Sequence, residues 1–131
     1  MQPHNLASLL HMMRNEMKNI LITGANRGLG LAYTTRLLAQ GARVLATRRD
    51  ESDASALEQL QHQYPERLLV YLNSLGSDAA LADLAERVAE DVAQLDVLIN
   101  NAGMLTDHET IETVRLDDLL TNFRVNTAVP V

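Results

Sequence analysis

The chain has 131 residues, a formal net charge of −6 at neutral pH, 47% hydrophobic residues and no cysteine. This length suits one domain with one core, and the missing cysteine excludes disulfides and thiolate metal sites and fits a reducing compartment, so we expect a cytoplasmic protein. The net acidity argues against nucleic acid as a partner, and no apolar run approaches the roughly 20 residues of a membrane span, so no membrane partner is expected.

Residues 1–18 are expected to form an N-terminal extension to a domain that covers residues 19–131. A short amphipathic helix could form in the extension, because apolar side chains recur there at roughly helical spacing. These side chains are Leu6, Leu9, Leu10, Met13 and Met17. Two interpretations stay open: a targeting or docking helix, and a frayed extension that lies on the domain.

From residue 19 onward, short apolar runs alternate with helical patterns. The apolar runs predict strands at residues 20–23, 44–47, 68–72 and 95–100. The helical patterns predict helices at residues 29–40, about 53–63, about 78–93 and about 114–128. Gly41 should close the first helix, and Ser52 or Asp53 should cap the second. We expect the fourth strand to be buried on both faces, and the alternation predicts an α/β fold with a parallel sheet between helices.

A glycine-rich turn, Thr23-Gly24-Ala25-Asn26-Arg27-Gly28-Leu29-Gly30, separates the first predicted strand from the first helix. The start of a helix offers free N–H groups and the positive end of its dipole to an anion. Glycine leaves room for the tight turn and for the approach of a pyrophosphate. The spacing Gly-x-x-x-Gly-x-Gly differs from the general Gly-x-Gly-x-x-Gly fingerprint. We predict that this turn holds the phosphates of a dinucleotide, and the alternative is a tight turn without a ligand.

Arg48 and Arg49 follow the second predicted strand, where a site for NAD carries an acidic residue that binds the ribose hydroxyls. Arginine instead accommodates a 2′-phosphate, and Arg27 in the turn could reach the same phosphate. We therefore predict NADP(H) as the cofactor in preference to NAD(H). Asp50 keeps the alternative open, because a shift of one residue would bring a carboxylate close to the ribose.

With these residues, the chain resembles the classical short-chain dehydrogenase/reductase family, and within it the carbonyl-reductase-like and C-factor-like members. Three motifs carry the resemblance in the family's order: the turn at residues 23–30, Asn100-Asn101-Ala102-Gly103, and Phe123-Arg124-Val125-Asn126. The resemblance covers residues 19–131. It implies a Rossmann-type doubly wound sheet with strand order 3-2-1-4, truncated after about four strands where complete members continue to a seventh.

The resemblance also implies roles for individual residues. The cofactor-binding turn includes Thr23, Gly24, Asn26, Arg27, Gly28, Leu29 and Gly30, and Arg48 and Arg49 lie where the family selects the adenosine ribose. Asn73 stands where the family usually has an Asp that binds the edge of adenine, and its amide offers an acceptor and a donor. Asn100, Asn101, Ala102 and Gly103 would brace the sheet and line the cofactor's ribose, with pure bracing as the alternative. Asn126 matches the family's catalytic asparagine.

The rest of the family's catalytic set is missing. Lys18 is the only lysine, so the chain has no Tyr-x-x-x-Lys, and the family's serine would come after Val131. We therefore expect the NADP-binding portion of a parent oxidoreductase that acts on a carbonyl or alcohol, inactive on its own. Two alternatives remain: a non-catalytic NADP-binding or interaction module, and a fragment that needs a partner chain to complete the sheet. The open edge of the fourth strand could also self-associate. The four scattered histidines suggest no metal site.

Overall fold

The structure is a computed structural model that describes residues 17–50, 53–103, 110 and 112–130. A parallel sheet lies at its centre and contains β1 (Asn19–Ile22), β2 (Arg43–Arg48), β3 (Leu68–Leu72) and β4 (Val97–Ile99). The strand order is β3-β2-β1-β4, so the α/β prediction and the predicted order are confirmed. The chain moves outward from β1 to β2 and β3, and then returns to the other side of β1 for β4.

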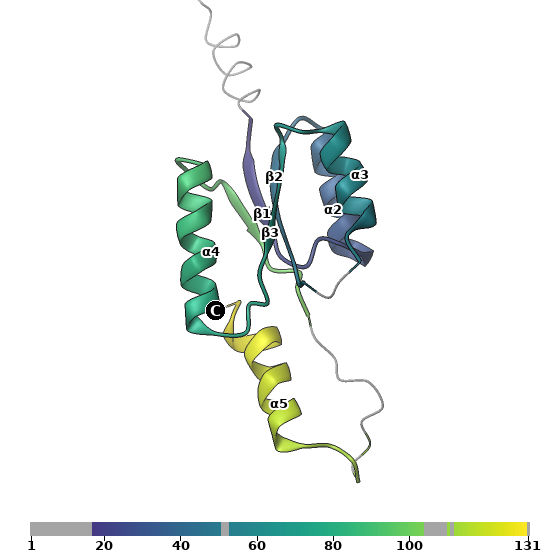
Figure 1. Cartoon of the computed structure of the whole chain (residues 1–131), viewed down its shortest axis with the longest axis vertical. Helices are drawn as coiled ribbons and strands as arrows, with labels where there is room; N and C mark the ends of the chain where they lie inside the picture. Colours follow the sequence, from purple (N-terminus) through teal and green to yellow (C-terminus); the bar gives the residue numbers. More distant parts are fainter. Residues whose placement is uncertain (1–16, 51–52, 104–109, 111, 131) are drawn as a thin grey trace, which may run out of the picture.

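Helices cover both faces of the sheet (Figure 1). Helices α2 (Gly28–Ala39) and α3 (Ser55–Gln63) lie on one face, and α4 (Asp78–Asp91) lies on the other. Helix α5 (Leu116–Phe123) lies beyond the end of the sheet and continues into a short π-helix, η1 (Arg124–Ala128). Helix α2 ends as predicted, since Gly41 follows it with a φ of +93°, a left-handed conformation that favours glycine.

Two apolar clusters hold the helices to the sheet, one on each face. Alternate side chains of a strand point to opposite faces, so Ile22 packs in one cluster and Leu21 in the other. Helix α2 contributes Leu38 to the first cluster, and α4 contributes Leu84 to the second. Leu38 has no exposed surface, and burying a leucine side chain contributes roughly 1.5–3 kcal/mol. The two central strands, β1 and β2, are buried along most of their length.

Strand β4 is shorter and more exposed than predicted. Val97 and Leu98 are 43% and 50% exposed, so the prediction of burial on both faces is wrong. The reason is that β4 pairs with β1 on one side only and is the last strand of the sheet in the part of the chain that the structure describes. A hydrophobic run identifies a strand but does not show whether neighbours cover it.

Several predicted helix ends need adjustment. Helix α3 begins at Ser55 with Ala54 at its N-cap position, so the predicted cap at Asp53 is wrong by one residue, although the carboxylate of Asp53 accepts from the N–H of Ser55 at 2.9 Å. Ser52 lies outside the described residues. The predicted helix at residues 114–128 begins two residues later and changes to π geometry in its last turn. Most of the predicted N-terminal helix is also outside the described residues, and Met17 is not helical. Among the described helices, none has both the length and the apolar character that a membrane crossing requires.

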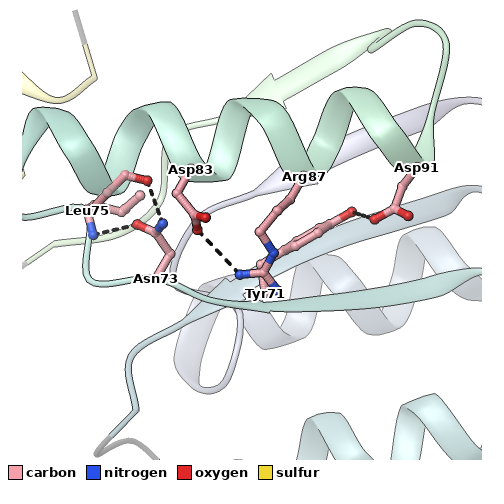
Figure 2. Close-up of polar contacts among 7 residues, drawn as sticks. Tyr71, Asn73, Leu75, Asp83, Arg87 and Asp91 are labelled. Atoms are coloured by element: carbon pink, nitrogen blue, oxygen red, sulfur yellow. Dashed lines mark hydrogen bonds and ion pairs between the residues drawn. The ribbon is translucent and has the colours of Figure 1, made fainter.

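Tyr71 joins β3 to α4. Its ring is buried, its hydroxyl donates to the Asp91 carboxylate at 2.5 Å, and the guanidinium of Arg87 lies over the ring at 5.1 Å from its centroid (Figure 2). Arg87 also pairs with Asp83 one turn earlier in the helix, at 3.6 Å. Burial, reinforced by the hydrogen bond to Asp91, raises the pKa of Tyr71 well above its usual range.

This pKa shift predicts that the Tyr71 hydroxyl loses its proton only at high pH. Because the folded-state pKa lies above the unfolded one, the contribution of Tyr71 to stability is complete below about pH 10 and is lost as the pH rises through the folded pKa. The chain has no tryptophan, so absorbance at tyrosinate wavelengths can follow its three tyrosines directly. Tyr71→Phe should remove the last titration step, whereas Tyr33→Phe, at an exposed position, should retain it. A last step that survives Tyr71→Phe would contradict the assignment.

Candidate functional site

A pocket of about 830 Å³ lies where the strands of the sheet end. The carboxyl ends of parallel strands meet at one edge, and ligands of open α/β sheets bind there at the point where the strand order reverses. In this chain that point lies between β1 and β4. The pocket is lined by Gly24, Asn26, Arg27, Gly28, Thr47, Arg48, Arg49, Asp53, Asn73, Ser74, Leu75, Asn101, Ala102, Gly103 and Val125.

The glycines of the turn after β1 are required for different reasons. Gly24 and Gly28 have φ values of +66° and +55°, which a side chain disfavours. A Cβ on Gly24 would also lie 2.9 Å from the Cα of Ala102. Gly30 has an ordinary φ, but its Cβ would lie 2.3 Å from the carbonyl oxygen of Gly24 and 2.5 Å from the Nδ2 of Asn101. The turn is therefore closely packed against the segment after β4.

Gly28 faces open space instead. A Cβ built there would have no neighbouring atom within 4 Å, and the residue lines the pocket at the start of α2. The Arg27 side chain does not cap this helix. The first N–H groups of a helix have no acceptor within it, so the start of α2 can donate to an anion in the pocket.

Thr23 and Asn101 tie the ends of β1 and β4 together. The Oγ1 of Thr23 accepts from the backbone N–H groups of Asn101 and Ala102 at 3.1 and 3.0 Å. In return, the Nδ2 of Asn101 donates to the carbonyls of Thr23 and Gly24 at 3.1 and 3.0 Å. Thr23 is 6% exposed and does not line the pocket. Its side chain therefore braces the site from behind.

Thr47, at the end of β2, holds the turn from the other side. Its buried Oγ1 accepts from the N–H of Gly24 at 3.1 Å, and its carbonyl accepts from the N–H of Ala25 at 2.9 Å. The hydroxyl and the carbonyl together fix the direction in which the chain leaves β1. Nothing in the sequence alone singled out Thr47, because its role depends on the register of β1 against β2.

Positive charge gathers at one end of the pocket. Arg27, Arg48 and Arg49 all line it, and the guanidinium of Arg48 donates to the carbonyl of Arg49 at 3.1 Å. Asp50 does not line the pocket, but Asp53 does. The backbone N–H of Ser55 holds the pKa of Asp53 below its usual range, so this carboxylate is charged at neutral pH. Three cations and one anion thus face the same space.

The pocket unites most, but not all, of the predicted site residues. Thr23, Leu29, Gly30, Asn100 and Asn126 do not line it. Asn126, on η1, is nevertheless near the pocket, since its Oδ1 lies 3.7 Å from where a Cβ on Gly103 would be.

Five residues that line the pocket were not predicted from the sequence: Thr47, Asp53, Ser74, Leu75 and Val125. Of these, Val125 lies within the sequence motif at residues 123–126, which is a signal that the sequence itself carries. Among the described residues, no cluster of His, Cys, Asp or Glu could hold a metal ion.

Comparison with known proteins identifies the family to which the chain belongs. The model of the short chain dehydrogenase family matches residues 18–131. The chain belongs to this family. A (+)-neomenthol dehydrogenase of Arabidopsis thaliana is 33% identical, over 77% of this chain and 38% of that protein. An NADP-dependent 3-hydroxy acid dehydrogenase of Schizosaccharomyces pombe is 29% identical, over 88% of this chain and 45% of that protein.

A solved structure agrees with this family assignment. A metagenomic short-chain oxidoreductase, in complex with NADP, superposes with a TM-score of 0.74 at 28% identity, over 86% of this chain and 51% of that one. This short-chain dehydrogenase sequence therefore spans about half of that structure and less than half of the two curated relatives.

The packing of the turn predicts how two glycine substitutions differ. Gly30→Ala should lower the free energy of unfolding by at least about 2 kcal/mol, because the overlap with backbone outweighs the roughly 1 kcal/mol that alanine gains in a helix. Gly28→Ala meets no atom and should cost only about 1 kcal/mol for its positive φ. Urea unfolding followed by far-UV circular dichroism measures both. Equal losses would show that the turn is not held against Asn101.

Proposed function

We propose that this chain is the NADP-binding portion of an oxidoreductase that acts on a carbonyl or alcohol. The observation that carries the proposal is one pocket, at the reversal of the strand order, that combines the glycine turn with the side chains of Arg27, Arg48 and Arg49. Its volume of about 830 Å³ lies within the range of roughly 300–1,000 Å³ that is usual for small-molecule sites.

The proposed pose places the pyrophosphate on the turn. The N–H groups at the start of α2 would donate to its oxygens, and the open space at Gly28 lets the phosphate approach the backbone. The adenosine would then lie between the end of β2 and the loop after β3, where Arg48 and Asn73 line the pocket. The nicotinamide half would extend past Ala102 and Gly103 toward Asn126.

The charges in the pocket favour NADP(H) over NAD(H). A 2′-phosphate brings up to two negative charges and three oxygens, for which guanidinium groups are geometrically suited partners. The carboxylate of Asp53 would oppose the phosphate, but three arginines line the same space. Support also comes from the S. pombe relative, named as NADP-dependent, and from the neighbour solved with NADP.

The activity belongs to the whole protein in this proposal. When bound, NADPH would supply a hydride to the carbonyl carbon of a small substrate, and the tyrosine of the family's Tyr-x-x-x-Lys would supply the proton to its oxygen. Within this chain Asn126 is the one residue matched to the family's catalytic set, and the sequence contains no Tyr-x-x-x-Lys. The chain on its own is therefore proposed to bind the cofactor without turnover, as a non-catalytic binding module would. A cytoplasmic location is proposed with it, supported by the absence of cysteine.

Arginine substitutions test the choice of cofactor. Arg48→Ala should weaken NADPH binding by about 10- to 100-fold, because hydrogen bonds to charged groups contribute about 1.5–3 kcal/mol, and should leave NADH binding almost unchanged. Arg27→Ala should act in the same direction. The measurement is titration followed by the fluorescence of the reduced nicotinamide, which no tryptophan obscures in this chain.

Arg36→Ala is the matched control, since Arg36 is exposed in the last turn of α2 and outside the pocket. Its NADPH and NADH affinities should equal those of the unaltered chain. If the unaltered chain shows no saturable NADPH binding below millimolar concentration, the proposed function is overturned. If Arg48→Ala loses the same affinity for NADPH and for NADH, only the proposed contact with the 2′-phosphate is overturned, and the proposed function is not.

A second candidate function concerns the edge of the sheet. Val97 and Leu98 of β4 are exposed, and so are Leu116, Leu120 and Phe123 of α5, at 70%, 57% and 59%. An apolar strand edge that pairs with no further strand among the described residues invites pairing with another strand, and exposed apolar side chains on a helix favour association. We propose that this edge takes up a further polypeptide, either a partner chain or a second copy of this chain.

Self-association through β4 can be tested by light scattering over a range of concentrations. The unaltered chain should form dimers or larger species, and Leu98→Lys should shift it toward the monomer, because a charge on the edge opposes strand pairing. Ala39→Lys, at an exposed position on α2, adds the same charge elsewhere and should change nothing. A strictly monomeric unaltered chain would rule out self-association.

A further inference from the structure

Asn73 follows β3 directly, in the wall of the pocket, and both ends of its side-chain amide are hydrogen-bonded within the protein. Its Oδ1 accepts from the backbone N–H of Leu75 at 2.8 Å, and its Nδ2 donates to the carbonyl of Ala80 at 2.7 Å (Figure 2). These partners determine the orientation of the amide, because a backbone N–H only donates and a carbonyl only accepts. With 8% of its surface exposed, Asn73 is largely enclosed.

Leu75 needs such support, because its backbone is left-handed. Its φ is +57°, and no other non-glycine residue in the described ranges has a positive φ. This conformation is unfavourable for a residue with a branched apolar side chain. The side chain is nevertheless 4% exposed and packs with Leu21, Leu45 and Tyr71. The hydrogen bond from its N–H to Asn73 holds the turn that allows this burial.

Asn73 also connects the turn to two other elements. Its own N–H donates to the carbonyl of Arg48 at 2.9 Å, which extends the pairing of β3 with β2. Ala80, its other partner, lies in the first turn of α4. The backbone N–H of Asn73 thus holds the end of β2, and its side chain holds the start of α4 and the pocket wall formed by Ser74 and Leu75.

We propose that Asn73 is a positioning residue that shapes the adenine end of the pocket through Leu75, and does not act by bonding to the base. The proposal rests on the function proposed above, because it takes the ligand to be an adenine dinucleotide. The proposal also implies that residue 73 of this chain must carry an amide and not a carboxylate. A carboxylate could still accept from Leu75, but its second oxygen would face the Ala80 carbonyl at 2.7 Å with no proton between them.

The substitutions Asn73→Asp and Asn73→Ala test this proposal against two ligands, NADPH and its hypoxanthine analogue, which lacks the exocyclic amino group of adenine. Each substitution should raise the dissociation constants of both ligands by the same factor, about tenfold, because the pocket wall is no longer held in its binding shape. Gln59→Glu, an exposed amide-to-acid change on α3 and outside the pocket, is the matched control and should alter neither dissociation constant.

Three other results would overturn the proposal. If Asn73→Asp binds NADPH as tightly as the unaltered chain or more tightly, and Asn73→Ala loses only the preference for adenine over hypoxanthine, then residue 73 contacts the base directly. If the Tm falls while both dissociation constants stay unchanged well below the Tm, the role is structural only. If the unaltered chain binds neither ligand, the function proposed above fails, and the positioning of a nucleotide fails with it.

Amide hydrogen exchange at Leu75 provides a measurement that does not depend on any ligand. The Leu75 N–H should be protected in the unaltered chain and in Gln59→Glu, and should lose that protection in Asn73→Ala. Unchanged protection in Asn73→Ala would show that Asn73 does not hold the turn. Far-UV circular dichroism of each variant establishes that the sheet and helices are still folded.

Discussion

Thr23 and Asn101 hold the ends of β1 and β4 together through hydrogen bonds in both directions, and the pocket depends on this contact. Beyond the last paired residues, the sheet no longer satisfies the backbone groups of either strand, so the two side chains take over that task. The contact also presses Gly24 against Ala102, with no room for a Cβ between them. The turn and the segment directly after β4 are therefore packed against each other, and Gly28 at the start of α2 lines the pocket beside them.

Charge is distributed unevenly over this fold. The chain as a whole is acidic, yet three arginines line one pocket together with a single carboxylate, that of Asp53. Local potential, not net charge, governs the binding of a small anion, because screening in salt confines surface electrostatics to within about 10 Å. The acidity that argued against nucleic acid is therefore consistent with the proposed site for a phosphorylated dinucleotide.

The far wall of the pocket depends on how β3 and α4 are joined. Tyr71 and Asn73 are two residues apart in an extended segment, so both point toward the same side of the sheet, where one bonds to the end of α4 and the other to its beginning (Figure 2). Two polar contacts at opposite ends of one helix fix its position along the strand. The left-handed Leu75 can be accommodated because the segments on either side of it are held in this way.

The sequence by itself determined the alternation of strands and helices, the strand order that the family resemblance implied, and the glycine turn with its arginines. These features depend on local periodicity and on motifs of neighbouring residues, and the comparisons support the same family. Only the tertiary structure decided that β4 is exposed, that Thr23 braces the pocket instead of lining it, and that Thr47, Asp53 and Leu75 belong to the site. It also showed that the amide of Asn73 is committed to Leu75 and Ala80. The physical reason is that burial and hydrogen-bond partners depend on residues distant in the chain, which only the packing of the sheet and helices brings together.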